Sequence, residues 1–449
     1  DHYIGLIYSM TNAVVNIAVL SEARRNARNP EERARVDRKL ADWLWVAKEL
    51  MEKDEELFTI ISEAVKADKD PLARIYEINR AYERGEEWAV KLVRGVVGRC
   101  IEGFKQTLAR LDIRFDSWDW ESEVAVWNKL TEEVITCLRS MGLAYEERGA
   151  LVFAADRVAE LAEVRGELGI PRAFSIPPLT LVRSDGTTLY PTRDIAYSIW
   201  KFKQGFERVI NVIAVQQALE QIQVRLALYA LGLTNEARNL LHYSYEMVTL
   251  PGAKMSARRG RYITADELVD EAVRRAGLEL IKRGLTLEKG GEVAERVGVG
   301  AVKYAMLSVS PSKPLAFSWD RVLDFERNSG PFIQYAYVRA RSIMRKASSR
   351  ELEPSMSTGT LGEEERELLF LVGYFPELIA EAADKLRVEQ LAYYLNELAL
   401  AFNKYYDSVP VLRAESREKA AGRLALVETV ARTLQRGMEL LGITPPTWM

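Results

Sequence analysis

The stretch Val209-Ile210-Asn211-Val212-Ile213-Ala214-Val215 is a nearly unbroken apolar run in the middle of the chain. Such a run is typical of a strand that is buried on both faces, as in a parallel sheet. The pattern predicts a helix over about residues 217–231, ended by Gly232, and a further strand at 242–248. Strand, helix and strand in alternation predict an α/β fold with a doubly wound, Rossmann-like parallel sheet.

The residues before this run extend the same pattern. Residues 179–183 form a short predicted strand, Ser184-Asp185-Gly186 is a turn, and the chain returns over 187–190. Thr192 is then a candidate cap for a helix whose apolar face is directed inward. The α/β region is therefore expected to begin well before residue 209.

Helical patterns flank this region on both sides. Apolar residues recur at helical spacing before residue 110 and again after about 325, where a Gly- and Pro-containing loop at 351–362 interrupts them. The aromatic and acidic segment 115–122 is expected to be a strand or loop that anchors a neighbour. We predict three domains: a helical insertion or remainder of the catalytic domain (1–110), a catalytic domain (111–325) and an all-α bundle (326–449).

Composition excludes several protein classes. The chain has 449 residues, of which 48% are hydrophobic and 28% charged, which excludes a collagen, a disordered tail and a disulfide scaffold. Its net charge of −3 argues against wholesale charge-driven nucleic-acid binding, although one domain can still carry a basic face. Its cysteines are Cys100 and Cys137 and its histidines His2 and His242, so we predict no zinc or histidine metal centre and a reducing, cytoplasmic location.

The first residues are unlike a targeting segment. Asp1-His2-Tyr3-Ile4-Gly5 has no Met and no basic region, so a signal peptide is not expected. No window of 18 uncharged apolar residues occurs, so we predict no membrane association. The chain is expected to begin inside a domain.

The most informative segment for chemistry is Lys254-Met255-Ser256-Ala257-Arg258, which lies between Gly252 and Gly260. A glycine-flanked loop of this kind can fold over a polyphosphate and neutralise developing negative charge, although a solvated basic turn is an alternative. The segment resembles the KMSKS loop of class I aminoacyl-tRNA synthetases, in the KMSxR form of the arginyl-tRNA synthetase family. The resemblance implies ATP binding by Lys254, Met255 and Ser256 and catalytic roles for Lys254, Ser256 and Arg258.

A second segment, residues 185–196, resembles the DG…LYxTRDIA signature of the same family. The resemblance implies that Tyr190 and Asp194 bind the substrate arginine. A carboxylate can accept two parallel hydrogen bonds from a guanidinium, and a phenol can add a third contact. Taken alone, Asp194 also fits a first-turn carboxylate that is favoured by the helix dipole.

Further ligand contacts are implied around the predicted strands. The family places a substrate-contacting glutamine after the buried strand, which corresponds to Gln217, whereas Gln216 fits a polar residue at a helix start. The strand before the KMSAR segment lies on the adenine side in this family, so His242 and Met247 are candidates for the ATP pocket. A lone His or Met in such a place is more often a packing residue.

A fourth segment, residues 328–343, resembles the GPYxQYAxxR entry into the family's anticodon-binding domain. Basic side chains beside tyrosines suit phosphate contact and base stacking, and a solvated basic face is the alternative. The implied tRNA-binding residues are Tyr335, Arg339, Arg341, Arg345, Phe402, Tyr406 and Met449.

The resemblance as a whole implies an arginine–tRNA ligase that uses ATP, Mg²⁺, arginine and tRNA(Arg). The family's HIGH motif is absent, because His2-Tyr3-Ile4-Gly5 lacks the second histidine and its structural context. The chain is therefore expected to be a carboxyl-terminal fragment, a monomer when complete or dependent on an amino-terminal fragment. Two alternatives stay open: a non-catalytic tRNA-binding module derived from a synthetase, and a synthetase for another amino acid.

Overall fold

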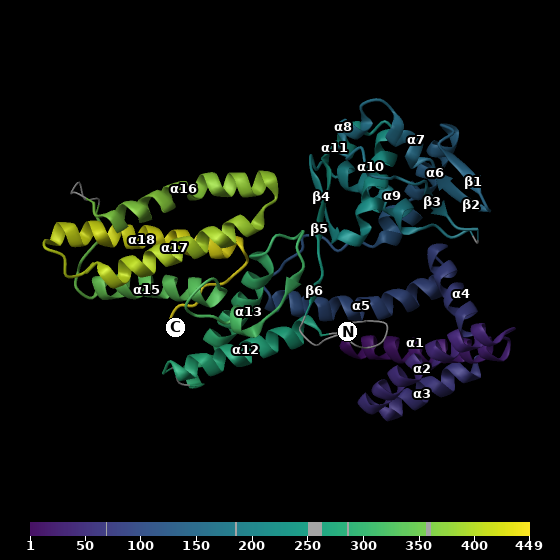
Figure 1. Ribbon diagram of the computed structural model, residues 1–449, viewed down its shortest axis with the longest axis horizontal. Helices are drawn as coiled ribbons and strands as arrows, with labels where there is room; N and C mark the ends of the chain where they lie inside the picture. The colour runs from purple at the N-terminus through teal and green to yellow at the C-terminus, as the bar shows by residue number, and fades with distance from the viewer. Residues whose placement is uncertain (69, 185, 250–262, 285–286, 356–360) are drawn as a thin grey trace. The chain divides into compact units, whose positions relative to one another are not determined.

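The computed structural model describes residues 1–68, 70–184, 186–249, 263–284, 287–355 and 361–449 (Figure 1). The chain divides into two compact units. The first contains Asp1–Phe104 and Phe115–Glu246, and the second contains Lys105–Arg114 and most of the chain after Met247. The two units are described separately below.

The first unit begins with long helices. They are α1 (His2–Arg25), α2 (Pro30–Lys53), α3 (Glu55–Ala67), α4 (Pro71–Glu83) and α5 (Glu87–Arg110). Side-chain caps begin α2 and α3, where Asn29 and Asp54 accept hydrogen bonds from the first-turn amides of Glu32 and Leu57. Met10, Leu50 and Ile61 help to form a small apolar core between α1, α2 and α3.

Helix α1 is long and apolar enough to cross a membrane when only length and composition are considered. The sequence prediction of no membrane association overlooked this helix. Its Met10 and Ala13 are fully buried in the core with α2 and α3. In all, 22% of the apolar window of this helix is buried.

The α/β part of the first unit follows. Its elements are η1 (Ser122–Trp127), α6 (Leu130–Ser140), β1 (Ala144–Glu147), β2 (Ala150–Phe153), α7 (Ala155–Glu160), α8 (Val164–Glu167), β3 (Leu179–Val182), α9 (Tyr190–Lys203), β4 (Val209–Ala214), η2 (Val215–Gln217), α10 (Ala218–Ala230), α11 (Thr234–Asn239) and β5 (Leu240–Tyr245). Strands β1, β2 and β3 form an antiparallel sheet, and β4 pairs with β5 in parallel, with Val209 opposite Leu240. The predicted parallel pairing around residues 209–215 is confirmed.

The predicted burial of this strand on both faces is wrong. Val209 is buried on β4, but Ile210 and Val212 are 40% and 62% exposed. Helices α9 and α10 pack on one side, and within the described residues β4 and β5 make a sheet of their own. Successive side chains of a strand point to opposite faces of the sheet. Because one face of β4 is uncovered, every second apolar side chain of this strand is exposed.

Two local predictions also need correction. Thr192 is not the helix cap, because α9 begins at Tyr190 with Pro191 in its first turn, and the buried Thr192 hydroxyl donates to the Leu181 carbonyl oxygen (2.7 Å). The single strand expected at 242–248 is two strands. The first, β5, ends at Tyr245, and Val248–Thr249 (β6) pairs with Leu315–Ala316 (β7) in the second unit.

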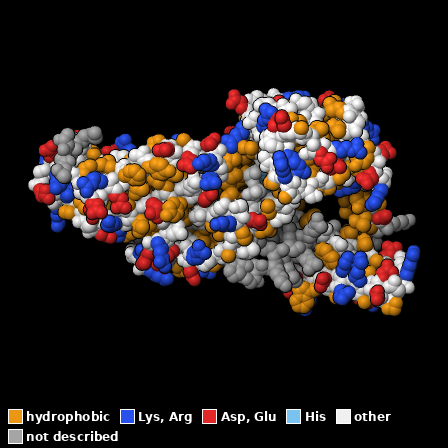
Figure 2. Space-filling view, turned by 45° about the horizontal axis from the view of Figure 1, so that its top comes forward, with side chains coloured by type: hydrophobic (Ala, Val, Ile, Leu, Met, Phe, Trp, Pro, Cys, Tyr) orange, Lys and Arg blue, Asp and Glu red, His pale blue; other side chains and the backbone are white. Residues whose placement is uncertain are grey.

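The second unit is mainly helical. Beyond β6 and β7 it contains α12 (Ala265–Lys282), α13 (Leu287–Leu307), α14 (Trp319–Val322), α15 (Gly330–Ser348), α16 (Glu363–Lys385), α17 (Val388–Ser408) and α18 (Arg417–Leu440). The large core of this unit joins α15, α16, α17 and α18 and includes Tyr304 of α13. Apolar side chains also remain at the surface in both units, as the orange patches of Figure 2 show. The helical bundle expected near the carboxyl end is confirmed.

Candidate active site

Tyr190 opens helix α9 beside a cavity of about 530 Å³ in the first unit. The Tyr190 side chain is 71% exposed and belongs to the lining of this cavity. Aromatic and arginine side chains contribute to the rest of the wall. They include Tyr76, Arg80, Tyr82, Trp120, Arg183 and Arg193.

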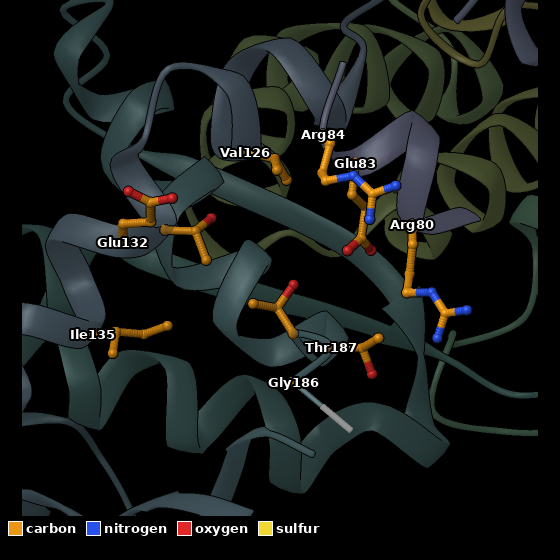
Figure 3. Close-up of a pocket in the computed structure, with 10 residues that line it drawn as sticks. Arg80, Glu83, Arg84, Val126, Glu132, Ile135, Gly186 and Thr187 are labelled. Carbon is orange, nitrogen blue, oxygen red and sulfur yellow. The ribbon is translucent and has the colours of Figure 1, made fainter. Parts of the chain in front are cut away.

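A smaller cavity of about 250 Å³ has several walls in common with the larger one. Figure 3 shows Arg80, Glu83 and Arg84 of α4 on one side and Gly186 and Thr187 on the other. The segment after β3 thus lines both cavities. Arg183 N donates to Thr187 O (2.9 Å), which closes the predicted turn, and Gly186 adopts a left-handed φ of 83° that suits glycine.

Asp194 lies one helical turn after Tyr190, so the two side chains occupy one face of α9. Its carboxylate is half-buried, and its Oδ2 accepts a hydrogen bond from Gln221 Nε2 of α10 (3.0 Å). Burial raises the pKa of Asp194 above its ordinary value, the Gln221 hydrogen bond and the Lys201 charge lower it, and Glu121 raises it further. A partly buried carboxylate is a suitable partner for a cation, because an opposite charge favours its ionised form.

Arg193 was not singled out by the sequence, although it lies within the same TRD segment. Its Nη1 donates to Glu121 (3.2 Å), its Nη2 pairs with Glu83 of α4, and its Nε donates to Thr188 (3.1 Å). Arg193 therefore ties α9 to α4 and to the segment before η1. Opposite charges across these elements give no local sequence pattern that could have revealed the contact.

The aromatic and acidic segment 115–122 does anchor its neighbours, as predicted. Tyr197 of α9 donates to Asp119 (2.7 Å), and the Arg94 guanidinium of α5 lies 4.8 Å from the ring centre of Trp120. Arg94 also pairs with Glu123. The segment is a loop that leads into η1 rather than a strand.

The other predicted ligand contacts are distributed over both units. Gln217 is exposed at the end of η2, where the carboxyl end of β4 leads into α10. His242 is half-buried on β5, and its Nε2 lies 2.9 Å from the carbonyl oxygen of Ile213. Met247 is 52% exposed and belongs to the second unit. Gln217, His242 and Met247 do not line either cavity.

Lys254, Met255, Ser256 and Arg258 lie outside the described residues. Within the described part of the chain, no group of three or more His, Cys, Asp or Glu side chains is placed to hold a metal ion. Mg²⁺ that accompanies a nucleotide takes most of its ligands from phosphates and water.

In the second unit, Arg339 of α15 is held between two aromatic rings. Its guanidinium carbon lies 4.7 Å from the ring centres of both Tyr335 and Tyr406. Its Nη1 donates to Asn403 (3.1 Å) and lies 3.6 Å from Asp407. Tyr335, Arg339, Asn403 and Asp407 line a cavity of about 700 Å³ in this unit.

The remaining candidate tRNA contacts differ in exposure. Arg341 and Arg345 are exposed on α15, and Arg345 Nη1 donates to the Thr447 carbonyl oxygen (3.0 Å). Met449 is half-buried against the apolar core. The prediction for Phe402 needs correction, because its ring is 0% exposed within the bundle core and cannot stack on a base without opening that core.

Comparison with known proteins gives consistent matches over both units. A family profile described as "tRNA synthetases class I (R), catalytic domain" matches residues 36–319, and one described as "DALR anticodon binding domain" matches residues 333–449. The chain is 44% identical to the arginine–tRNA ligase of Pyrobaculum aerophilum, over 100% of this chain and 70% of that protein. It is 43% identical to the corresponding ligase of Ignicoccus hospitalis, over 100% of this chain and 69% of that protein. The structure of Thermus thermophilus arginyl-tRNA synthetase matches with a TM-score of 0.72 and 28% identity, over 92% of this chain and 74% of that chain.

Proposed function

Since the chain belongs to the class I arginyl-tRNA synthetases and is an arginine–tRNA ligase, we propose that Tyr190, Asp194 and Gln217 bind its substrate arginine. The family also accounts for the fold class, a Rossmann-like catalytic domain followed by a helical anticodon-binding domain. The observation that carries the assignment is the Tyr190–Asp194 pair on one face of α9, of which Tyr190 lines the cavity of about 530 Å³ whereas Asp194 lines neither cavity.

Asp194 is the charge partner of the arginine guanidinium in this proposal. Its Oδ2 is held by Gln221, and burial disfavours the isolated carboxylate, so a cationic side chain would relieve an unfavourable charge. Two parallel N–H bonds from a guanidinium would add direction to the attraction. An apolar amino acid would leave this carboxylate uncompensated, which argues against a synthetase for such a substrate.

The reaction has two steps in this family. The arginine carboxylate attacks the α-phosphorus of ATP, pyrophosphate leaves, and a ribose hydroxyl of the tRNA terminus then takes the arginyl group from the adenylate. We assign Lys254, Ser256 and Arg258 to stabilising the leaving pyrophosphate, and Lys254, Met255, Ser256, His242 and Met247 to the ATP pocket. Mg²⁺ is proposed as part of the ATP substrate.

We also propose that the ATP phosphates need a HIGH-type element in addition to the KMSAR segment. These 449 residues do not contain one, since their two histidines are His2 and His242. Activity would then require that this element be supplied to the chain. The location is proposed to be cytoplasmic and the chain free of membranes, as is typical of the family.

The helical bundle is the proposed tRNA-binding surface. Tyr335, Arg339, Arg341, Arg345, Tyr406 and Met449 remain candidates, whereas the buried Phe402 does not. Arg339 is braced by two aromatic rings and by Asn403, which fits a positioned phosphate contact or a stacking platform. The arginine-specific acceptor is proposed to be tRNA(Arg).

Arginine use should depend on pH through Asp194. Burial raises the pKa of this carboxyl, so its charge is lost as the pH falls through a value above the ordinary aspartate value of about 3.9. Lys201, Glu121 and Glu220 lie near enough to influence it and must be kept unchanged in the comparison. The Michaelis constant for arginine should therefore rise on the acid side while that for ATP does not. If the Michaelis constant for arginine rose only at or below the ordinary pKa of aspartate, the assignment of Asp194 to arginine binding would be contradicted.

Arg341→Ala should weaken tRNA binding. Because an exposed arginine that contacts one phosphate releases counterions on binding, the slope of log affinity against log salt should fall by about 1. Affinity measured by filter binding at several salt concentrations checks this. The matched control is Arg432→Ala on α18, whose side chain is 77% exposed and paired with Glu428. If both variants and the unaltered chain gave the same slope, Arg341 would not be part of the tRNA-binding surface.

The alternative expected from the sequence, a tRNA-binding module without ligase activity, is disfavoured by the match to arginine–tRNA ligases over the whole chain. The exposed basic residues of α15 fit such a module as well as they fit a ligase. A pure binding module has no chemical reason to hold the half-buried Asp194 carboxylate on the face of α9 that also carries Tyr190. Measuring ATP-dependent attachment of arginine to tRNA separates the two functions.

A further inference from the structure

A chain of three hydrogen bonds leads from Lys201 to Asp194 inside the α/β region. Lys201 Nζ donates to Asn211 Oδ1 (2.6 Å), Asn211 Nδ2 donates to Gln221 Oε1 (2.8 Å), and Gln221 Nε2 donates to Asp194 Oδ2 (3.0 Å). Helix α9 carries both ends, β4 carries Asn211, and α10 carries Gln221. The chain of bonds therefore joins three elements of the fold at the carboxylate.

The two charged ends fix the direction of every bond in this chain. An ammonium group can only donate, so Asn211 must present its oxygen to Lys201 and its nitrogen to Gln221. Gln221 then presents its nitrogen to Asp194, and an ionised carboxylate can only accept. If either amide group rotated by half a turn, its NH₂ group would face another donor and its oxygen would face another acceptor.

The two amides lie where an apolar residue would be the usual choice. Asn211 is 9% exposed and Gln221 is 2% exposed. Burying an amide is unfavourable unless its hydrogen bonds are satisfied, and a fully satisfied buried network restrains its members strongly. The restraint falls on the Asp194 carboxylate.

We propose that Gln221 is a positioning residue for the substrate arginine, held in place by Asn211 and Lys201. By binding Oδ2, Gln221 sets the plane of the carboxylate and leaves Oδ1, which has no partner among the described residues, for the guanidinium. The Lys201 charge lowers the pKa of Asp194 and so favours the ionised carboxylate that a cationic ligand needs. This inference rests on the proposed arginine-binding role of Asp194.

The test replaces Gln221 with methionine, which preserves its length and removes both hydrogen bonds. The Michaelis constant for arginine should rise by about tenfold to a hundredfold, because a hydrogen bond to a charged group is lost, while that for ATP stays within about twofold. The matched control is Gln223→Met on the same helix, since Gln223 is 4% exposed and donates to the Pro177 carbonyl oxygen (2.7 Å). The control should leave the arginine constant unchanged although it loses a comparable buried hydrogen bond.

A double-mutant cycle with Asp194→Ala separates the positioning role of Gln221 from the proposed arginine-binding role of Asp194. If Gln221 acts through Asp194, Gln221→Met should add nothing to the loss of arginine use in the Asp194→Ala background. Equal effects of Gln221→Met in both backgrounds would overturn the positioning role. No effect of Asp194→Ala alone would instead overturn the proposed arginine site.

Lys201→Met provides a second variant if Gln221→Met does not fold. Lys201 is half-buried at the far end of the chain of bonds, so its loss should disturb folding less than a change at Gln221. Because the buried Asn211 Oδ1 would lose its donor and the restraint on Asn211 and Gln221 would weaken, we expect a severalfold rise in the Michaelis constant for arginine. An unchanged constant in a folded Lys201→Met variant would overturn the inference.

Discussion

Replacing Asp194 with alanine is expected to raise the Michaelis constant for arginine by about a thousandfold, because a desolvated ion pair with the guanidinium is lost. The variant should still bind tRNA with unaltered affinity, since the candidate tRNA contacts lie in the second unit. Steady-state aminoacylation at varied arginine concentration and filter binding of tRNA measure the two effects. The Michaelis constant for arginine of Asp194→Asn should lie between those of the unaltered chain and Asp194→Ala, because asparagine keeps the shape of the side chain and loses its charge.

The control for this prediction is a carboxylate of the same unit away from the cavities. Glu167→Ala breaks an ion pair with Arg238 (2.6 Å) and touches neither cavity lining. Its arginine constant should match that of the unaltered chain. Thermal unfolding of both variants shows whether either one has lost its fold, and unchanged arginine kinetics in a folded Asp194→Ala variant would contradict the site.

Replacing Lys254 with alanine is expected to slow arginyl-adenylate formation by about a hundredfold or more, since removing one preorganised group that stabilises developing charge costs this much. The affinity for ATP should change far less, because pyrophosphate carries its additional charge only as the bond to the α-phosphorus breaks. Single-turnover measurements of adenylate formation at varied ATP concentration separate the rate from the affinity.

Arg259→Ala is the matched control in the same basic segment. Arg259 lies next to the KMSAR residues but is not among those to which the family resemblance assigns a catalytic role. Its loss should reduce the rate only slightly. A Lys254 variant that changes ATP affinity alone, with an unaltered rate at saturation, would argue against the leaving-group role.

Much of the candidate site could be predicted from local sequence. The family resemblance pointed to Tyr190 and Asp194, but the helix start was expected at Thr192, and their common face follows only because α9 begins at Tyr190. The helical bundle and its basic entry helix α15 also follow from periodicity. These features depend on contacts between residues that are near each other in the chain.

Features that depend on distant contacts could not be predicted. Gln221 reaches Asp194 from 27 residues away, and Arg193 reaches Glu83 across 110 residues. The exposure of Val212 depends on which elements cover β4, and an apolar run carries no information about that. The family resemblance implied a tRNA contact for Phe402, but the packing of the bundle places it in the core.

The most direct test of the central claim is aminoacylation of total tRNA with radiolabelled arginine. The assay uses this chain alone and with a HIGH-containing amino-terminal fragment added in trans, and citrulline tests whether the cationic guanidinium is required. The account predicts ATP-dependent charging with arginine when the HIGH element is present, no charging with citrulline, and loss of charging in Asp194→Ala. Tight tRNA binding without arginine charging in either arm would contradict the account and favour the binding module.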